Sequence, residues 1–185
     1  MTRNLSFLIL AVVLVIVIAM IGLYFASRLR ASARTRWEDL LMSLVAIDRT
    51  GVDRVALDAI DPSGERRTDQ LARELEPNEI WKLLGGIDGI KKLEMNSHVL
   101  IEMAAFLQRS VPEAAVVAED LRLQAKELEW HVERLRMAHE QGSLEFHIPT
   151  YAQNAAITYY LMEQRLQALC QRKNVPTFRF VQKAH

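Results

Sequence analysis

The sequence predicts a mainly α-helical protein, with one N-terminal transmembrane helix followed by an antiparallel helical bundle. Residues 5–26 contain no charged side chain. Three later segments repeat apolar residues at alternating steps of three and four, which is the spacing of a buried helix face. The 185 residues include only 7 Gly and 5 Pro, fewer than a loop-rich or all-β chain requires.

The first predicted element is the apolar run "LSFLILAVVLVIVIAMIGLYFA" at 5–26. A helix of this length spans roughly 33 Å, enough to cross the hydrocarbon core of a bilayer. A cleavable signal peptide has a shorter apolar run of about 7–15 residues before its cleavage site. The small residues "ASA" at 31–33 also come after two arginines. We therefore expect an uncleaved membrane anchor.

Charges on either side of this run predict its orientation. Only Arg3 precedes it, whereas four arginines follow it before the first acidic residue: Arg28, Arg30, Arg34 and Arg36. The positive-inside rule then places the N-terminus outside and the C-terminal part in the cytoplasm, in an inner (cytoplasmic) membrane or an equivalent one. Each arginine near the surface contributes about 1 kcal/mol of attraction to anionic headgroups. Residues 1–36 are thus interpreted as an anchor with a basic flank.

Residues 37–76 are interpreted as a juxtamembrane helical segment, and their pattern is the least decisive. Apolar residues from Trp37 to Ile47 have helical spacing, so a helix should run to about Asp48 before Gly51 interrupts it. Residues 49–60 fit a helix or a strand equally well. The sequence "DPSG" at 61–64 predicts a turn, and residues 65–75 a short helix.

Residues 77–185 are expected to form a helical bundle with a C-terminal tail. "PNEIWKLLGG" predicts a short helix at 78–84 that ends at the two glycines. Longer helices follow at about 87–108, 114–139 and 149–174, with Pro112 and Glu113 in the first turn of the second. Their short connections imply antiparallel neighbours. The predicted buried seams are Ile90, Leu93, Ser97, Leu100, Ala104 and Leu107; Ala114, Ala118, Leu121, Ala125, Leu128, Val132 and Leu135; and Ala152, Ala155, Tyr159, Met162, Leu166 and Leu169.

Two of these helices carry a second apolar set on the opposite side. In 87–108 the set is Met95, Val99, Met103 and Phe106, and in 114–139 it is Val116, Leu123, Trp130 and Met137. The chain itself could cover these sets with the helix at 37–48, the short helix at 78–84, or the tail with Phe178 and Phe180. Alternatively, the set on 114–139 is an exposed interface, since Trp and Met are enriched at interface centres.

Acid–histidine spacing raises the possibility of a metal site. Glu94, His98 and Glu102 follow one another at steps of four, and Glu127 and His131 repeat the step. Carboxylate-bridged di-iron bundles instead need Glu-x-x-His on two helices. A turn near residue 111 would also separate the two histidines by roughly 10 Å along the bundle axis. We expect both histidines to flank their seams in solvated i,i+4 pairs.

Other chemistries find little support. The one cysteine, Cys170, excludes an intrachain disulfide or a multi-cysteine metal site, and we expect it to be buried. A net charge of zero gives no field that would attract nucleic acid. The glycines of "LLGGIDGIKKL" at 83–93 could precede a phosphate-binding helix start, but a hinge also explains them. Since no common catalytic motif is present, we expect no enzyme, no cofactor and no small-molecule substrate.

The expected function is a non-catalytic, membrane-anchored interaction or accessory subunit that presents a cytoplasmic helical bundle. Its expected partners are the membrane and either another protein or a second copy of the chain, meeting Val116, Leu123, Trp130 and Met137. Two alternatives remain open at this point. One is a homo-oligomeric structural helical protein, and the other is a metal-dependent enzyme that uses Glu and His on the bundle helices.

Overall fold

The computed structural model describes residues 14, 20, 36–61, 74–108 and 114–172. The chain divides into two compact units, Met1–Arg36 and Trp37–His185. Of the first unit, Leu14 and Met20 are described as helical and Arg36 as exposed. The transmembrane helix predicted at 5–26 otherwise lies outside the described residues, as do Arg28, Arg30 and Arg34. Within the described part of the chain, no helix is both long and apolar enough to cross a membrane.

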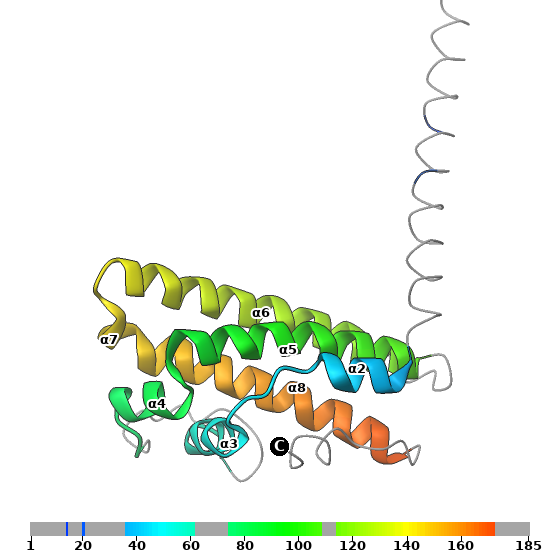
Figure 1. Ribbon diagram of the computed structural model, residues 1–185, viewed down its shortest axis with the longest axis horizontal. Coiled ribbons are helices and arrows are strands. Elements are labelled where there is room, and N and C mark those ends of the chain that lie inside the picture. Colours follow the sequence, from blue (N-terminus) through cyan, green and yellow to red (C-terminus); the bar gives the residue numbers. More distant parts are fainter. Residues whose placement is uncertain (1–13, 15–19, 21–35, 62–73, 109–113, 173–185) are drawn as a thin grey trace, which may run out of the picture. The chain divides into compact units, whose positions relative to one another are not determined.

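The second unit is mainly helical, as predicted. Three long helices, α5, α6 and α8, form a bundle, and α2, α3 and α4 pack around it (Figure 1). Between α7 and α8 the chain makes a π-helical turn, Ile148–Ala152. The helices run over Trp37–Ser43 (α2), Arg49–Asp58 (α3), Pro77–Leu83 (α4), Gly86–Leu107 (α5), Ala114–Glu140 (α6), Leu144–His147 (α7) and Gln153–Arg172 (α8).

Side-chain contacts show that α6 and α8 are antiparallel. Asp120, near the start of α6, lies 3.3 Å from Arg165, near the end of α8. Further along α6, the Trp130 ring lies 5.3 Å from Tyr151, just before α8 begins. The short connection through α7 accounts for this arrangement, because it returns the chain directly along the helix it has left.

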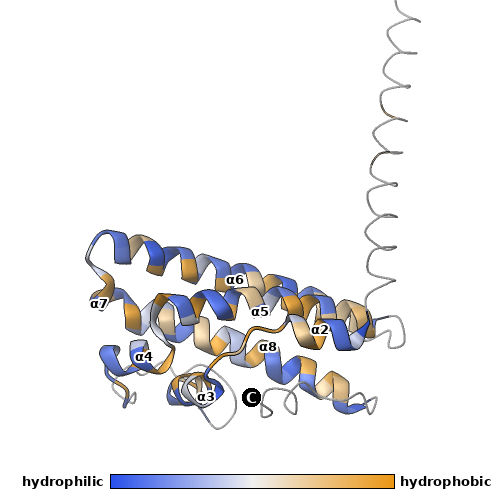
Figure 2. Ribbon diagram, in the orientation of Figure 1, coloured by the Kyte–Doolittle hydropathy of each residue, from blue (hydrophilic) through white to orange (hydrophobic). Residues whose placement is uncertain are grey.

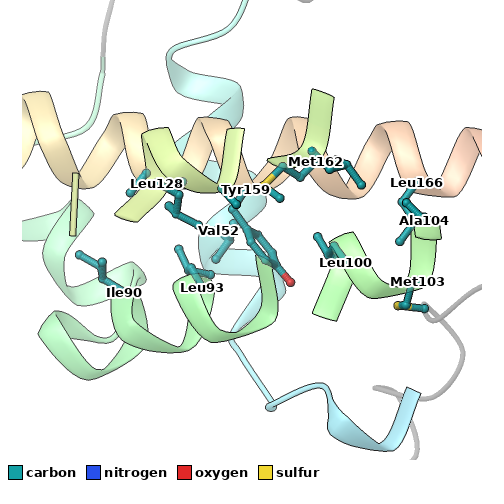
Figure 3. Close-up of a cluster of buried hydrophobic side chains, with 14 of the residues drawn as sticks. Val52, Ile90, Leu93, Leu100, Met103, Ala104, Leu128, Tyr159, Met162 and Leu166 are labelled. Atoms are coloured by element: carbon teal, nitrogen blue, oxygen red, sulfur yellow. The ribbon is translucent and has the colours of Figure 1, made fainter. Parts of the chain in front are cut away.

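All three predicted seams are buried, which confirms the helical periodicity on which they were based. Figure 3 shows α5, α6 and α8 contributing Leu93, Leu128 and Tyr159 to one cluster, which Val52 of α3 joins. Figure 2 shows apolar and polar positions alternating along the long helices. The α6 seam includes Ala114 and Ala118, which are fully buried. Alanines at such positions allow neighbouring backbones to approach closely.

The ambiguous segment 49–60 is a helix, α3, and Gly51 lies inside its first turn rather than interrupting it. The Asp48 side chain caps α3 by accepting a hydrogen bond from the Gly51 backbone N–H at 3.1 Å. A Cβ on Gly51 would lie 2.2 Å from the carbonyl oxygen of Leu83. The glycine therefore lets the end of α4 pack directly against α3. The preceding helix, α2, ends at Ser43, earlier than expected.

One further boundary differs from the sequence prediction. The last helical stretch begins at Leu144, not at Pro149, because Pro149 fits within the π-helical turn that continues α7 into α8. Between α4 and α5 the chain turns at Gly85 and Gly86, whose φ angles are +75° and +67°. These backbone angles strongly favour glycine, which supports the interpretation of a turn between two helices.

Candidate interaction surface on α6

The outer side of α6 carries an exposed line of apolar side chains. We call this set, which consists of Val116, Leu123, Trp130 and Met137, the α6 stripe. At a spacing of seven residues the positions drift by only about 20° per step around a helix, so the side chains form one nearly straight line. Their exposed fractions are 67% for Val116, 60% for Leu123, 49% for Trp130 and 39% for Met137. The helices at 37–43 and 77–83 therefore leave these four side chains substantially exposed. The tail with Phe178 and Phe180 lies outside the described residues.

The second apolar set, on α5, is partly covered by the rest of the chain. Met103 is fully buried, and the Phe106 ring lies 5.7 Å from Trp37 of α2. The helix at 37–43 thus covers the end of α5, as one of the two interpretations predicted. Met95, near the middle of α5, is exposed. The exposed apolar line is accordingly a property of α6.

Trp130 is held in place by its neighbours even though half of its surface is exposed. The Tyr151 ring meets it edge-on at 5.3 Å and 81°. On its own helix, the guanidinium carbon of Arg134 lies 5.3 Å from the Trp130 ring centroid. Ordering a side chain on binding costs about 0.5–1.5 kcal/mol, so a ring that is already fixed loses less. Trp and Arg are also enriched among residues that dominate binding energies.

Trp130 belongs to a cluster of rings that the sequence did not reveal: its ring centroid lies 5.1 Å from that of His131. His131 is buried, contrary to the expectation that it flanks the seam in solvent. Its ring lies 5.9 Å from that of Tyr151, and its Nε2 lies 3.6 Å from Oε1 of Glu127. The His147 ring also stacks on Tyr151, with the ring centroids 5.7 Å apart. The cluster brings α6 and α7 together through the π-helical turn and thereby supports Trp130.

The acid–histidine residues do not assemble into a metal site. His98 Nε2 lies 3.3 Å from Oε1 of Glu129, a carboxylate on α6 and not one of the acids four residues away on its own helix. Burial raises the pKa of Glu94 above its ordinary value, and the neighbouring Glu129 charge adds to this. Among the residues that the structure describes, no group of three or more His, Cys, Asp and Glu side chains has an arrangement that could hold a metal ion.

A buried polar network at the centre of the bundle was also missed by sequence reasoning. Glu163 of α8 is buried, forms an ion pair with Arg49 of α3, and accepts a hydrogen bond from the Tyr159 hydroxyl at 3.1 Å. Asn96 of α5 exchanges two hydrogen bonds with the Val45 backbone, at 2.8 and 2.9 Å. These contacts attach the α2–α3 connection to the bundle.

Burial dominates the protonation equilibria of this network. It raises the pKa of the Glu163 carboxyl above its ordinary value of 4.5, although the Arg49 charge and the Tyr159 hydrogen bond oppose the shift. It also raises the pKa of the Tyr159 hydroxyl well above 10.0, and the nearby Glu163 charge acts in the same direction. Because both side chains are buried within the bundle, we interpret the network as structural.

Cys170 is buried in the core, as expected. Burial raises the pKa of its thiol to about 11, which disfavours the reactive thiolate.

No family model, curated protein or solved structure matches the chain. The function proposed below consequently rests on the residues of the chain itself.

Proposed function

We propose that the chain is a non-catalytic, membrane-anchored interaction or accessory subunit whose helical bundle presents the α6 stripe to a protein partner. The observation that carries the proposal is the half-exposed Trp130, held by Arg134 and Tyr151 in the middle of an apolar line. Pre-ordered aromatic and arginine side chains are the kind of residue on which interfaces depend.

The membrane part of the proposal rests on the sequence. The uncharged run at 5–26 and the arginines after it favour a single-pass anchor with the N-terminus outside and the bundle in the cytoplasm. The full chain should then stay with the membrane pellet after alkaline carbonate extraction. Protease added to the cytoplasmic face should digest the bundle, whereas protease added to the opposite face should not. Release into the supernatant or the reverse protection would contradict this part.

The interaction part is tested by placing charge on the stripe. Leu123→Glu and Trp130→Glu, each introduced into the full chain, should abolish co-migration of the detergent-solubilised chain with its partner on native gels. Leu57→Glu is the matched control, because Leu57 of α3 is 53% exposed but lies outside the stripe. All three variants should keep the helical content of the wild type, and Leu123→Glu and Leu57→Glu should lower the melting temperature by no more than about 4 °C. A complex that survives both stripe substitutions would contradict the proposal.

A further inference from the structure

We infer that the α6 stripe binds an amphipathic helix of another protein, one that carries acidic side chains beside its own apolar line. The inference rests on the proposed function, which identifies the α6 stripe as an interface, and adds the chemistry of the partner. Seven-residue spacing suits a helix as the occupant, because apolar positions that repeat in this way stay in line with a second helix along its length. From Val116 to Met137 the stripe is roughly 32 Å long at 1.5 Å per residue.

Two cations beside the stripe have no carboxylate partner. Lys126 and Arg134 are exposed, and within the part of the chain that the structure describes neither forms an ion pair. Residues three and four apart are neighbours on a helix surface, so Lys126 flanks Leu123 and Arg134 flanks Trp130. Arg134 is held over the Trp130 ring, where its charge borders the stripe. Each of the two central residues of the stripe therefore has an uncompensated cation beside it.

The acids along the same part of α6 are already engaged within the chain. Three of them pair with arginines: Glu119 with Arg122 at 2.8 Å, Asp120 with Arg165 at 3.3 Å, and Glu133 with Arg136 at 2.8 Å. Glu127 is half-buried, 3.6 Å from His131. The charges left for a partner beside the centre of the stripe are consequently those of the two cations.

A partner helix matches this pattern when it brings carboxylates to both cations. Lys126 and Arg134 are eight residues apart, roughly 12 Å along α6. On a helix that lies beside α6, two acids eight residues apart span the same distance. Such acids next to an apolar line would satisfy the cations while that line covers the stripe. Charge complementarity of this kind fixes the register of a complex and selects among partners.

Three other occupants lack the complementary charge. A second copy of α6 would bring the same unpaired cations into the interface, where like charges repel. The tail at 173–185 contains three Lys or Arg residues and no Asp or Glu. An anionic membrane surface attracts basic segments, whereas α6 contains six acids and four Lys or Arg residues. The charges therefore favour an acidic helix of another protein.

Two synthetic peptides test the charge of the partner directly. Both form the same amphipathic helix with a line of leucines, and the positions beside this line hold glutamate in one peptide and lysine in the other. The glutamate peptide should bind the detergent-solubilised full chain more tightly than the lysine peptide, and Leu123→Glu should abolish its binding. Lys126→Gln combined with Arg134→Gln removes two exposed charge pairs, so it should raise the Kd of the glutamate peptide roughly 2- to 30-fold. Equal binding of both peptides, or no binding of the glutamate peptide, would overturn the inference.

Two other arginines of α6 provide the matched control. Arg122→Gln combined with Arg136→Gln removes the same total charge, but each of these arginines is already paired with an acid of its own chain. This control should raise the Kd of the glutamate peptide by a smaller factor than the other double variant does. Both double variants should keep the helical content of the wild type, because all four side chains are exposed. Equal increases in Kd would show that only the net charge of α6 matters, which would overturn the inference.

The outcomes separate this inference from the proposed function. If Leu123→Glu abolishes co-migration with the natural partner, but Lys126→Gln with Arg134→Gln weakens it no more than the control does, the inference fails and the proposed function stands. If Leu123→Glu changes no association at all, both fail.

Three results would identify a different occupant, and each would overturn the inference. A dimer of the full chain that Leu123→Glu dissociates would place a second copy on the stripe. Cross-links within one chain from Lys126 to Lys173 or Lys183 would place the tail there. Quenching of Trp130 fluorescence in the reconstituted full chain by brominated phosphatidylserine would place the membrane there, with Trp130→Phe as the reference that assigns the signal.

Discussion

Two leucines on α6 provide a matched test of which side of this helix is core. Leu128 is fully buried in the seam, whereas Leu123 is 60% exposed on the stripe. Truncating a fully buried leucine to alanine costs about 2–5 kcal/mol, because the lost transfer free energy is joined by the cost of a cavity. Full burial of a leucine side chain stabilises the fold by roughly 1.5–3 kcal/mol, and only about two fifths of the Leu123 surface is buried. Its truncation therefore loses only that share of the burial free energy, and no cavity forms at an open surface. We expect Leu123→Ala to cost about 1 kcal/mol or less, part of it offset by the helix propensity of alanine.

The assay is thermal unfolding of the full chain, followed by circular dichroism in mild detergent. In a domain of this size 1 kcal/mol corresponds to roughly 2–4 °C in Tm. Leu128→Ala should therefore lower the Tm by at least about 4 °C, and Leu123→Ala by no more than about 4 °C. Low chain concentration keeps association from adding to the measured stability. Equal, large losses for both variants would refute the assignment of the stripe to the surface.

Three further predictions concern the interior. Gly51→Ala should destabilise the fold by about 1–3 kcal/mol in urea unfolding, because its Cβ would meet the Leu83 carbonyl, although alanine is the better helix former. The folded pKa of Glu163 lies above its ordinary 4.5, so the wild type should lose stability relative to Glu163→Gln as pH rises from 4.5 through that raised pKa, and the difference should then stay constant. A difference that grows in favour of the wild type over this range would contradict the assigned shift. Cys170 should react with a thiol reagent at least about 100-fold more slowly in the native chain than in denaturant.

The sequence predicted the long helices well because their periodicity reports burial directly. Each seam steps by three and four, and a seam of that kind can face only one side of a helix. The segment 49–60 could not be assigned in this way, because its apolar residues fit both periods. Its helical state depends on the Asp48 cap and on the contact between Gly51 and Leu83, and that contact joins residues far apart in the chain.

The candidate site was predictable only in part, for a related reason. The sequence showed that α6 has two apolar sides, but whether a side is covered depends on which helices pack against it. His131 was misplaced because Tyr151, against which it packs, comes from the turn before α8. The buried Glu163 was missed because a charged residue in a sequence normally indicates solvent, and its partner Arg49 lies 114 positions away.

Lys126 reports on whether the α6 stripe binds another chain, because this lysine lies on α6 between Leu123 and Trp130. The most direct measurement is lysine cross-linking of the full chain in mild detergent, followed by mass spectrometry, for the wild type, Leu123→Glu and the Leu57→Glu control. We expect intermolecular cross-links from Lys126 in the wild type and in Leu57→Glu, and their loss in Leu123→Glu. Cross-links from Lys126 that stay within one chain in all three proteins would contradict this expectation.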